Sequence, residues 1–218
     1  MTRAVVFDLD GVIVDSEQVW DDVRERYTRE VGGTYTETAA RDMMGMSSSE
    51  WSRYMAEQLG VPGTPEEINA EVVRRMLSRY GEAPPFISGA VAAIRRVAAQ
   101  WPLAIASSSN PELIDVVVAA AGLDDVFRVR VSSQEVARGK PAPDVYLEAA
   151  RRLAVAAASC GAVEDSHNGI LSAKAAGMFV VAVPNLHYPP DPGTTAQADV
   201  VLGSITELEP DVFTGSRG

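Results

Sequence analysis

Two carboxylates directly follow an apolar segment near the start of the chain. Residues 4–7 are AVVF, and the acidic residues Asp8 and Asp10 come next, with Gly11 behind them. Four apolar residues with two adjacent valines predict a short strand that is buried on both faces. Burying one carboxylate is costly, and a second one beside it adds repulsion. We interpret the pair as part of a cation site and of a reaction that uses both acids, with an acidic turn as the alternative.

Five further polar side chains follow later apolar segments of the chain. They are Ser107, Ser108, Lys140, Glu164 and Asp165. In open parallel α/β sheets, ligands bind outside the carboxyl ends of the strands. Because these ends meet at one edge of the sheet, we expect the five side chains to lie near Asp8 and Asp10.

The acidic residues can supply the metal ligands, the nucleophile and the general acid/base that metal-dependent phosphoryl transfer requires. Mg²⁺ prefers oxygen ligands and usually keeps several waters, so two or three protein oxygens suffice. Asp8 together with Glu164 or Asp165 meets this need. A carboxylate nucleophile such as Asp8 can form an aspartyl-phosphate, which divides one difficult step into two. Asp10 can protonate the leaving alkoxide and later accept a proton from water. We therefore predict Asp8 and Asp10 as catalytic residues and Mg²⁺ as the cofactor.

The serines and the lysine suit the binding of phosphate oxygens. Ser107 and Ser108 offer a hydroxyl and backbone amides at the predicted start of a helix. Lys140 adds a compact positive charge. Taken singly, a serine run can simply cap a helix, and a lysine before a proline can be a solvated loop residue. Their joint occurrence at successive strand ends favours a phosphate-binding site.

Strands and helices alternate through most of the chain, which is typical of a parallel α/β sheet. The predicted strands are 4–7, 103–106, 126–131, 160–163, 179–183 and 199–202. The predicted helices between them are 88–100, 111–121, 143–153 and 166–176, and a Pro/Gly-rich loop is predicted at 184–198.

Residues 16–83 contain helix signals without a strand signal. The predicted helices are 17–30, 36–43, 48–59 and 65–80. Thr64 and Pro65 give the last of them a capping residue and a first-turn proline. We predict an α/β fold in which a Rossmann-like parallel sheet core, residues 1–15 and 84–218, is interrupted by an inserted α-helical cap domain, residues 16–83. An insertion directly after a functional strand is well placed to act as a lid.

The net charge and the cysteine content limit the classes of binding partner and the cellular compartment that we expect. The net charge of −11 argues against binding to nucleic acids or anionic membranes, where Lys and Arg must neutralise phosphates. A local cation site still permits a small phosphorylated metabolite as the partner. The single cysteine, Cys160, fits a reducing cytoplasm. We expect a cytoplasmic monomer or small homo-oligomer.

Four segments of the chain carry a resemblance to a known family. They are DLDGV at 8–12, the serine run that begins at Ser107, GKPAPD at 139–144 and GAVEDS at 161–166. In order and spacing they resemble the four motifs of the haloacid dehalogenase superfamily over essentially the whole chain. The helical insertion resembles the cap of its β-phosphoglucomutase-like branch, which includes sugar-phosphate phosphatases.

The resemblance implies a role for each candidate residue. Asp8 would be the nucleophile and a Mg²⁺ ligand, and Asp10 the general acid/base with its backbone carbonyl on the metal. The residues implied to hold the transferring phosphoryl group are Ser107 and Lys140, and those that complete the metal site are Asp165 and Glu164.

The same resemblance separates several activities. Dehalogenases of the superfamily typically lack the second aspartate of the first motif, so Asp10 argues against dehalogenation. The related mutases use a cap histidine near the position of Trp20 and a cap arginine soon after the equivalent of Gly45, where this chain has a tryptophan and serines. We therefore expect a Mg²⁺-dependent phosphatase for a small sugar or polyol phosphate. The alternatives are a β-phosphoglucomutase-like phosphosugar mutase and a non-catalytic phospholigand-binding protein.

Trp20 and Met46 are the predicted substrate-facing cap residues, with core packing as the alternative.

Overall fold

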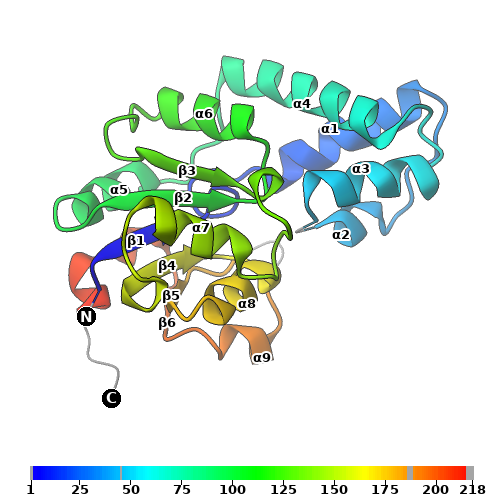
Figure 1. Cartoon of the computed structure of the whole chain (residues 1–218). Helices are drawn as coiled ribbons and strands as arrows, with labels where there is room; N and C mark the ends of the chain where they lie inside the picture. The colour runs from blue at the N-terminus through cyan, green and yellow to red at the C-terminus, as the bar shows by residue number, and fades with distance from the viewer. Residues whose placement is uncertain (1, 45, 186–188, 215–218) are drawn as a thin grey trace.

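The computed structural model of the chain describes residues 2–44, 46–185 and 189–214. Gly45 and part of the predicted loop, residues 186–188, therefore lie outside the described residues. Six strands in the described part form one parallel sheet in the order β3-β2-β1-β4-β5-β6 (Figure 1). Their bounds are Ala4–Phe7 (β1), Leu103–Ser107 (β2), Val129–Ser132 (β3), Cys160–Glu164 (β4), Phe179–Ala182 (β5) and Val200–Val201 (β6). The predicted α/β fold with a parallel sheet is confirmed.

The register of the central strands brings their polar ends together. Phe7, the last residue of β1, lies between Ile105 of β2 and Val163 of β4. Continuing this register by one residue brings Asp8 beside Glu164. The carboxyl ends of parallel strands lie at the same edge, so the acids of β1 and β4 meet although they are far apart in the sequence.

Side chains of β1 alternate between two hydrophobic clusters, one on each face of the sheet. Val5 and Phe7 belong to the cluster that includes residues of α5 and α6, whereas Ala4 and Val6 belong to the cluster that includes residues of α7 and α8. The bounds of these helices are Ala90–Ala98 (α5), Pro111–Ala120 (α6), Asp144–Arg152 (α7) and His167–Ala175 (α8). The sheet is therefore the middle of three layers, which explains why its strands are apolar on both faces.

Helices α1–α4 follow one another between β1 and α5, grouped to one side of the sheet (Figure 1). Their bounds are Glu17–Glu30 (α1), Ala39–Met43 (α2), Ser48–Glu57 (α3) and Pro65–Glu82 (α4). Reciprocal hydrogen bonds between Thr64 and Glu67 cap the start of α4. Within the described ranges, every helix is too short or too polar to cross a membrane. The proposed domain boundaries at residues 15/16 and 83/84 remain a prediction.

The two connections between the insertion and the sheet run side by side. The amide of Asp15 donates to the carbonyl of Pro85 at 2.8 Å, and the amide of Ile87 donates to the carbonyl of Ile13 at 3.0 Å. The insertion therefore begins and ends at the same place.

Several predicted boundaries were wrong by one to three residues, and two of them have a clear local reason. Strand β3 begins at Val129 rather than at residue 126, because the amides of Val126 and Phe127 both donate to the carbonyl of Leu123 in a turn. Helix α5 begins at Ala90 rather than at residue 88, because Gly89 has a φ of +82° that no right-handed helix contains.

The predicted loop 184–198 also contains a short helix, α9 (Pro192–Thr195). The Asp191 carboxylate accepts a hydrogen bond from the amide of Thr194 at 3.0 Å and caps this helix. A capping aspartate followed by proline is a helix start signal, which the overall proline and glycine content of the segment obscured.

A buried hydrogen bond joins the insertion to the sheet domain and can be tested. Ser48 of α3 donates its hydroxyl to Oδ1 of Asn110, the residue before α6, at 2.8 Å. We expect Ser48→Ala to lower the free energy of unfolding by about 1–2 kcal/mol, because the Asn110 amide loses a buried partner. The exposed neighbour Ser49 is the control, and Ser49→Ala should change stability by less than about 0.5 kcal/mol. Urea unfolding measures both, and equal effects would contradict the structural role of this bond.

Candidate active site

Asp8 lies one residue beyond β1 and is fixed by the backbone around it. Its amide donates to a carbonyl of β4 at 3.0 Å, and its carboxylate accepts from the amide of Leu9 at 2.8 Å. The residue is only 6% exposed. Burial raises the pKa of Asp8 to about 8; Lys140 lowers it in part, whereas Glu164 and Asp10 add to the rise. A carboxylate that ionises with difficulty on its own is thus held at the edge of the sheet.

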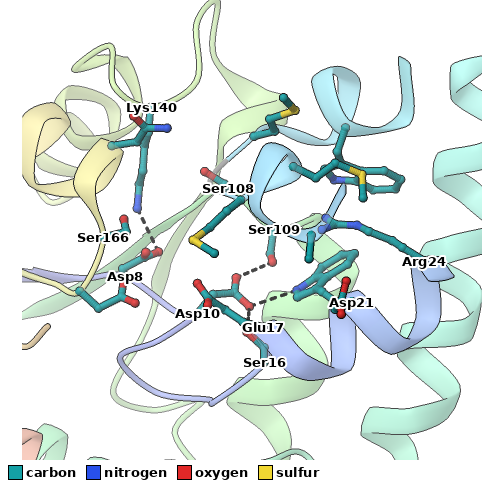
Figure 2. Close-up of a pocket in the computed structure, with 18 residues that line it drawn as sticks. Asp8, Asp10, Ser16, Glu17, Asp21, Arg24, Ser108, Ser109, Lys140 and Ser166 are labelled. Atoms are coloured by element: carbon teal, nitrogen blue, oxygen red, sulfur yellow. Dashed lines mark hydrogen bonds and ion pairs between the residues drawn. The ribbon is translucent and has the colours of Figure 1, made fainter. Parts of the chain in front are cut away.

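Lys140 supplies a buried positive charge next to this carboxylate. Its Nζ lies 3.0 Å from Oδ1 of Asp8 and 2.6 Å from Oε1 of Glu164. Figure 2 shows the lysine side chain extending toward Asp8. Burial acts to lower the pKa of Lys140, but the two carboxylates outweigh it and raise the pKa above its ordinary value. The lysine therefore stays charged in the pocket.

Glu164 is fully buried, and both of its carboxylate oxygens have partners. Besides Lys140, Oε1 accepts a hydrogen bond from the Tyr146 hydroxyl at 2.6 Å, and Oε2 accepts one from the Ser166 hydroxyl at 3.2 Å. A Cβ atom on Gly169 would lie 1.9 Å from Oε2, so α8 packs directly against the carboxylate. Glu164 is engaged by the protein beneath the cavity rather than forming part of its wall.

Asp165 is the buried carboxylate that faces the cavity. It is 2% exposed and lines the cavity, and its carboxylate receives no hydrogen bond from the described residues. Burial, together with Glu164 and Asp8, raises its pKa well above the ordinary value. Gly11, at a φ of +74°, packs so closely that a Cβ atom there would lie 1.8 Å from Oδ2 of Asp165. A buried and unpaired carboxylate of this kind fits a bound cation.

The oxygens of three acids are close enough to surround one metal ion. Ligand atoms of Asp8, Glu164 and Asp165 all lie within 4.8 Å of one another. A site built from carboxylate oxygens alone suits Mg²⁺ better than softer transition metals.

Asp10 is oriented by three hydrogen-bond donors (Figure 2). Ser109 donates to Oδ2 at 2.6 Å, while the Ser16 hydroxyl and the Trp20 indole at 3.3 Å both donate to Oδ1. Ser16 stands at the cap position of α1 but makes no side-chain capping bond, because its hydroxyl is used by Asp10. The sequence analysis missed Ser109, although it is the third residue of the serine run. One donor comes from the segment that follows β2, and two come from the insertion.

The predicted phosphate-binding serines occupy different positions. Ser107 is completely buried, and its hydroxyl accepts a hydrogen bond from the amide of Ser109 at 3.0 Å. Ser108, together with Ser109, lines the cavity. The role of Ser107 in phosphate binding stays a prediction, since its hydroxyl lies behind the cavity wall.

A cavity of about 110 Å³ lies between the sheet edge and the insertion. The predicted site residues that line it are Asp8, Asp10, Trp20, Met46, Ser108, Lys140 and Asp165. Trp20 also packs against Trp51 in the hydrophobic cluster, with ring centroids 5.9 Å apart. It therefore lies in the core as well as in the cavity wall, and its contact with substrate stays a prediction. The sequence analysis missed Glu17 and Arg24, which line the same cavity. Their signal is the spacing i, i+3, i+7 with Trp20, which places all three on one face of α1.

Known proteins resemble this chain over nearly its whole length. The hexitol phosphatase B of Escherichia coli (strain K12) is 31% identical over 208 residues, which cover 94% of this chain and 93% of that protein. The bifunctional riboflavin kinase/FMN phosphatase of Arabidopsis thaliana is 31% identical over 210 residues. The match covers 95% of this chain but 55% of that protein, so the chain spans about half the length of this relative.

The fold also matches a solved structure at similar coverage. The crystal structure of CbbY from Rhodobacter sphaeroides in complex with phosphate has a TM-score of 0.85 and 26% identity, covering 95% of this chain and 96% of that chain. The family model described as haloacid dehalogenase-like hydrolase matches residues 5–183, which extend from β1 to β5 and include the whole insertion. With the strand-end acids and the lysine in the order of its four motifs, the chain belongs to the haloacid dehalogenase-like hydrolase family.

Proposed function

We propose that the protein is a Mg²⁺-dependent phosphatase that hydrolyses a small phosphate monoester through an aspartyl-phosphate on Asp8. The observation that carries this proposal is the buried Asp8 carboxylate, which faces a cavity between the charged Lys140 and the unpaired Asp165. A nucleophilic carboxylate repels a phosphate anion unless positive charge screens both, and the site combines one fixed ammonium with a cluster suited to a cation.

Asp8 and Asp165 would hold the metal ion, together with the backbone carbonyl of Asp10 that the family motif implies. The ion would supply positive charge that favours the ionised carboxylates and screens the phosphate. Glu164 is the acid whose oxygens the protein already uses, so we assign it the positioning of Lys140 rather than direct metal binding.

The chain's own residues divide the reaction into two displacements. In the first, an oxygen of Asp8 forms a bond to phosphorus while the bond from phosphorus to the leaving alcohol breaks, and Asp10 gives that alcohol its proton. In the second, Asp10 takes a proton from water as the water oxygen bonds to phosphorus, which releases inorganic phosphate and restores Asp8. Lys140 balances charge on the phosphoryl oxygens, and the three donors to Asp10 keep its carboxylate directed at the cavity.

The substrate class that we propose is a small sugar or polyol phosphate. The similarity to a hexitol phosphatase supports it, as does the small size of the cavity, one wall of which is formed by the insertion. A cytoplasmic location and a monomeric or small homo-oligomeric state belong to the same proposal, supported by the single buried thiol of Cys160.

The activity can be tested with a panel of sugar, polyol and nucleotide phosphates, with Mg²⁺ and with EDTA. We expect phosphate release from at least one small polyhydroxylated ester with Mg²⁺, and its loss with EDTA. Asp8→Asn should reduce turnover by about 10³-fold or more, because an amide is a poor nucleophile. Circular dichroism checks that the variant is folded. No turnover of any ester by folded wild-type protein would refute the phosphatase, whereas interconversion of sugar phosphates without phosphate release would favour the mutase.

The position of Asp165 can be tested through the glycine that packs against it. Gly11→Ala should weaken Mg²⁺ binding and kcat/KM by about 10–100-fold, because the new Cβ atom must displace the Asp165 carboxylate. Gly32→Ala is the matched control, since Gly32 has a similar φ of +86° but open space around it. Calorimetric Mg²⁺ titration of both variants gives the answer. Equal losses would mean that backbone strain, rather than Asp165, is responsible.

The pKa of Asp8 predicts how Mg²⁺ binding depends on pH. In the metal-free protein Asp8 holds its proton below about pH 8, and this proton must leave when the cation binds. The apparent affinity should therefore rise between pH 6 and pH 8, by about tenfold for each pH unit and proton released. Titration calorimetry in buffers of different ionisation enthalpy measures the protons directly. A constant affinity without proton release would show that Asp8 is already ionised before the metal binds.

A further inference from the structure

Arg24 of α1 is a buried cation in the wall of the cavity, on the side of the insertion. The residue is 8% exposed, and its guanidinium carbon lies 4.7 Å from the ring centroid of Trp20 and 4.8 Å from that of Trp51. In Figure 2 the side chain extends from α1 toward the centre of the cavity, beyond Asp10 as seen from Asp8. The two indole rings hold the guanidinium plane while leaving its edge for polar contacts.

Arg24 donates no hydrogen bond to the described residues. Its Nε is buried without a hydrogen-bond partner, and in the described part of the chain the side chain forms no ion pair. Burial lowers the pKa of Arg24 to about 10, which leaves the group charged at neutral pH. Burying a charge without hydrogen bonds is costly, and we infer that a bound ligand supplies the missing acceptors.

A buried acceptor without a partner lies in the same cavity. Oε2 of Glu17 has no hydrogen-bond partner among the described residues, and Glu17 stands seven residues, two helical turns, before Arg24. Asp21, on the same face of α1, also lines the cavity and accepts a hydrogen bond from the Tyr35 hydroxyl at 2.5 Å. The distal end of the cavity therefore offers a strong donor together with acidic acceptors.

We propose that Arg24 and Glu17 form a leaving-group site that selects phosphate esters of polyhydroxylated alcohols. A hydroxyl group both donates and accepts, so it can satisfy the guanidinium as an acceptor and the carboxylate as a donor at once. A second phosphate or a carboxylate on the substrate could pair with Arg24, but it would lie against Glu17, Asp21 and Asp10. The inference rests on the proposed phosphatase activity and specifies its substrate class: a neutral, multiply hydroxylated leaving group.

The decisive comparison uses two esters that differ in the hydroxyl groups of the leaving group. Hexitol 6-phosphate carries several, and p-nitrophenyl phosphate carries none. For Arg24→Met we expect kcat/KM to fall about 20-fold or more with the hexitol ester, mainly through KM, and far less with the aryl ester. Arg26→Met is the matched control on the same helix, where Arg26 is largely exposed and pairs with Asp22. It should leave both reactions unchanged.

Two further measurements keep the outcome unambiguous. If Arg24→Met is less stable on thermal unfolding, Arg24→Lys keeps the charge and the aliphatic stem and should still lose preference for the hexitol ester. Glu17→Gln should also reduce that preference. A preference of the wild-type protein for carboxylated esters such as phosphoglycerate over the hexitol ester would identify an anionic leaving group and overturn the proposal. Equal losses with both esters, or no loss, would likewise overturn it. Absence of turnover of every ester of the panel described above by folded wild-type protein would instead refute the phosphatase itself, whereas turnover of other esters but not of the hexitol ester would overturn the leaving-group proposal alone.

Discussion

The interaction on which the rest of the structure depends is the buried contact of Lys140 with Asp8 and Glu164. Charged groups removed from water are stable only when each has a close partner, and removing one of them leaves the others uncompensated. Here three carboxylates, those of Asp8, Glu164 and Asp165, share one ammonium group. When all are ionised, two negative charges remain, which is the amount that one divalent cation balances. Burial, together with this excess of negative charge, raises the pKa values of Asp8 and Asp165.

The sheet and the insertion supply different parts of the site. The sheet domain supplies the charged groups that would surround the phosphoryl group. Asp8 follows β1, Asp165 follows β4, and Lys140 lies in the segment after β3. The insertion adds the indole of Trp20 and the side chains of Glu17 and Arg24 on the opposite wall. Asp10 is the point at which the two parts meet, because Ser109 on one side and Ser16 and Trp20 on the other orient the same carboxylate. The group assigned to proton transfer is thus oriented by both halves of the molecule.

The sequence was sufficient to predict which residues converge, but not how each is used. Asp8, Lys140 and Asp165 were predictable because the carboxyl ends of parallel strands must share one edge. The difference between Glu164 and Asp165 was not, since it depends on Tyr146 and α8 packing beneath one of two neighbouring acids. The bond from Ser16 to Asp10 was not predictable either, because a serine directly before a helix more commonly caps that helix.

The burial of Arg24 was likewise not predictable from the sequence. An arginine on an amphipathic helix ordinarily reaches solvent, and only the arrival of Trp51 from another helix buries it. A contact of this kind depends on tertiary packing, which local patterns do not contain. The helical character of the insertion could be predicted from its caps and spacing, whereas its cavity-facing residues could not be ranked.

The adjacent connections at Ile13–Ile87 and Asp15–Pro85 have a consequence for how such an enzyme can diversify. Because the chain leaves the sheet domain and returns to it at one point, the insertion resembles an enlarged loop of that domain. Its helices can lengthen, shorten or exchange residues without shifting the register of any strand. New leaving-group preferences can therefore evolve by replacing wall residues such as Glu17 and Arg24, while the strand-end carboxylates and Lys140 are inherited intact.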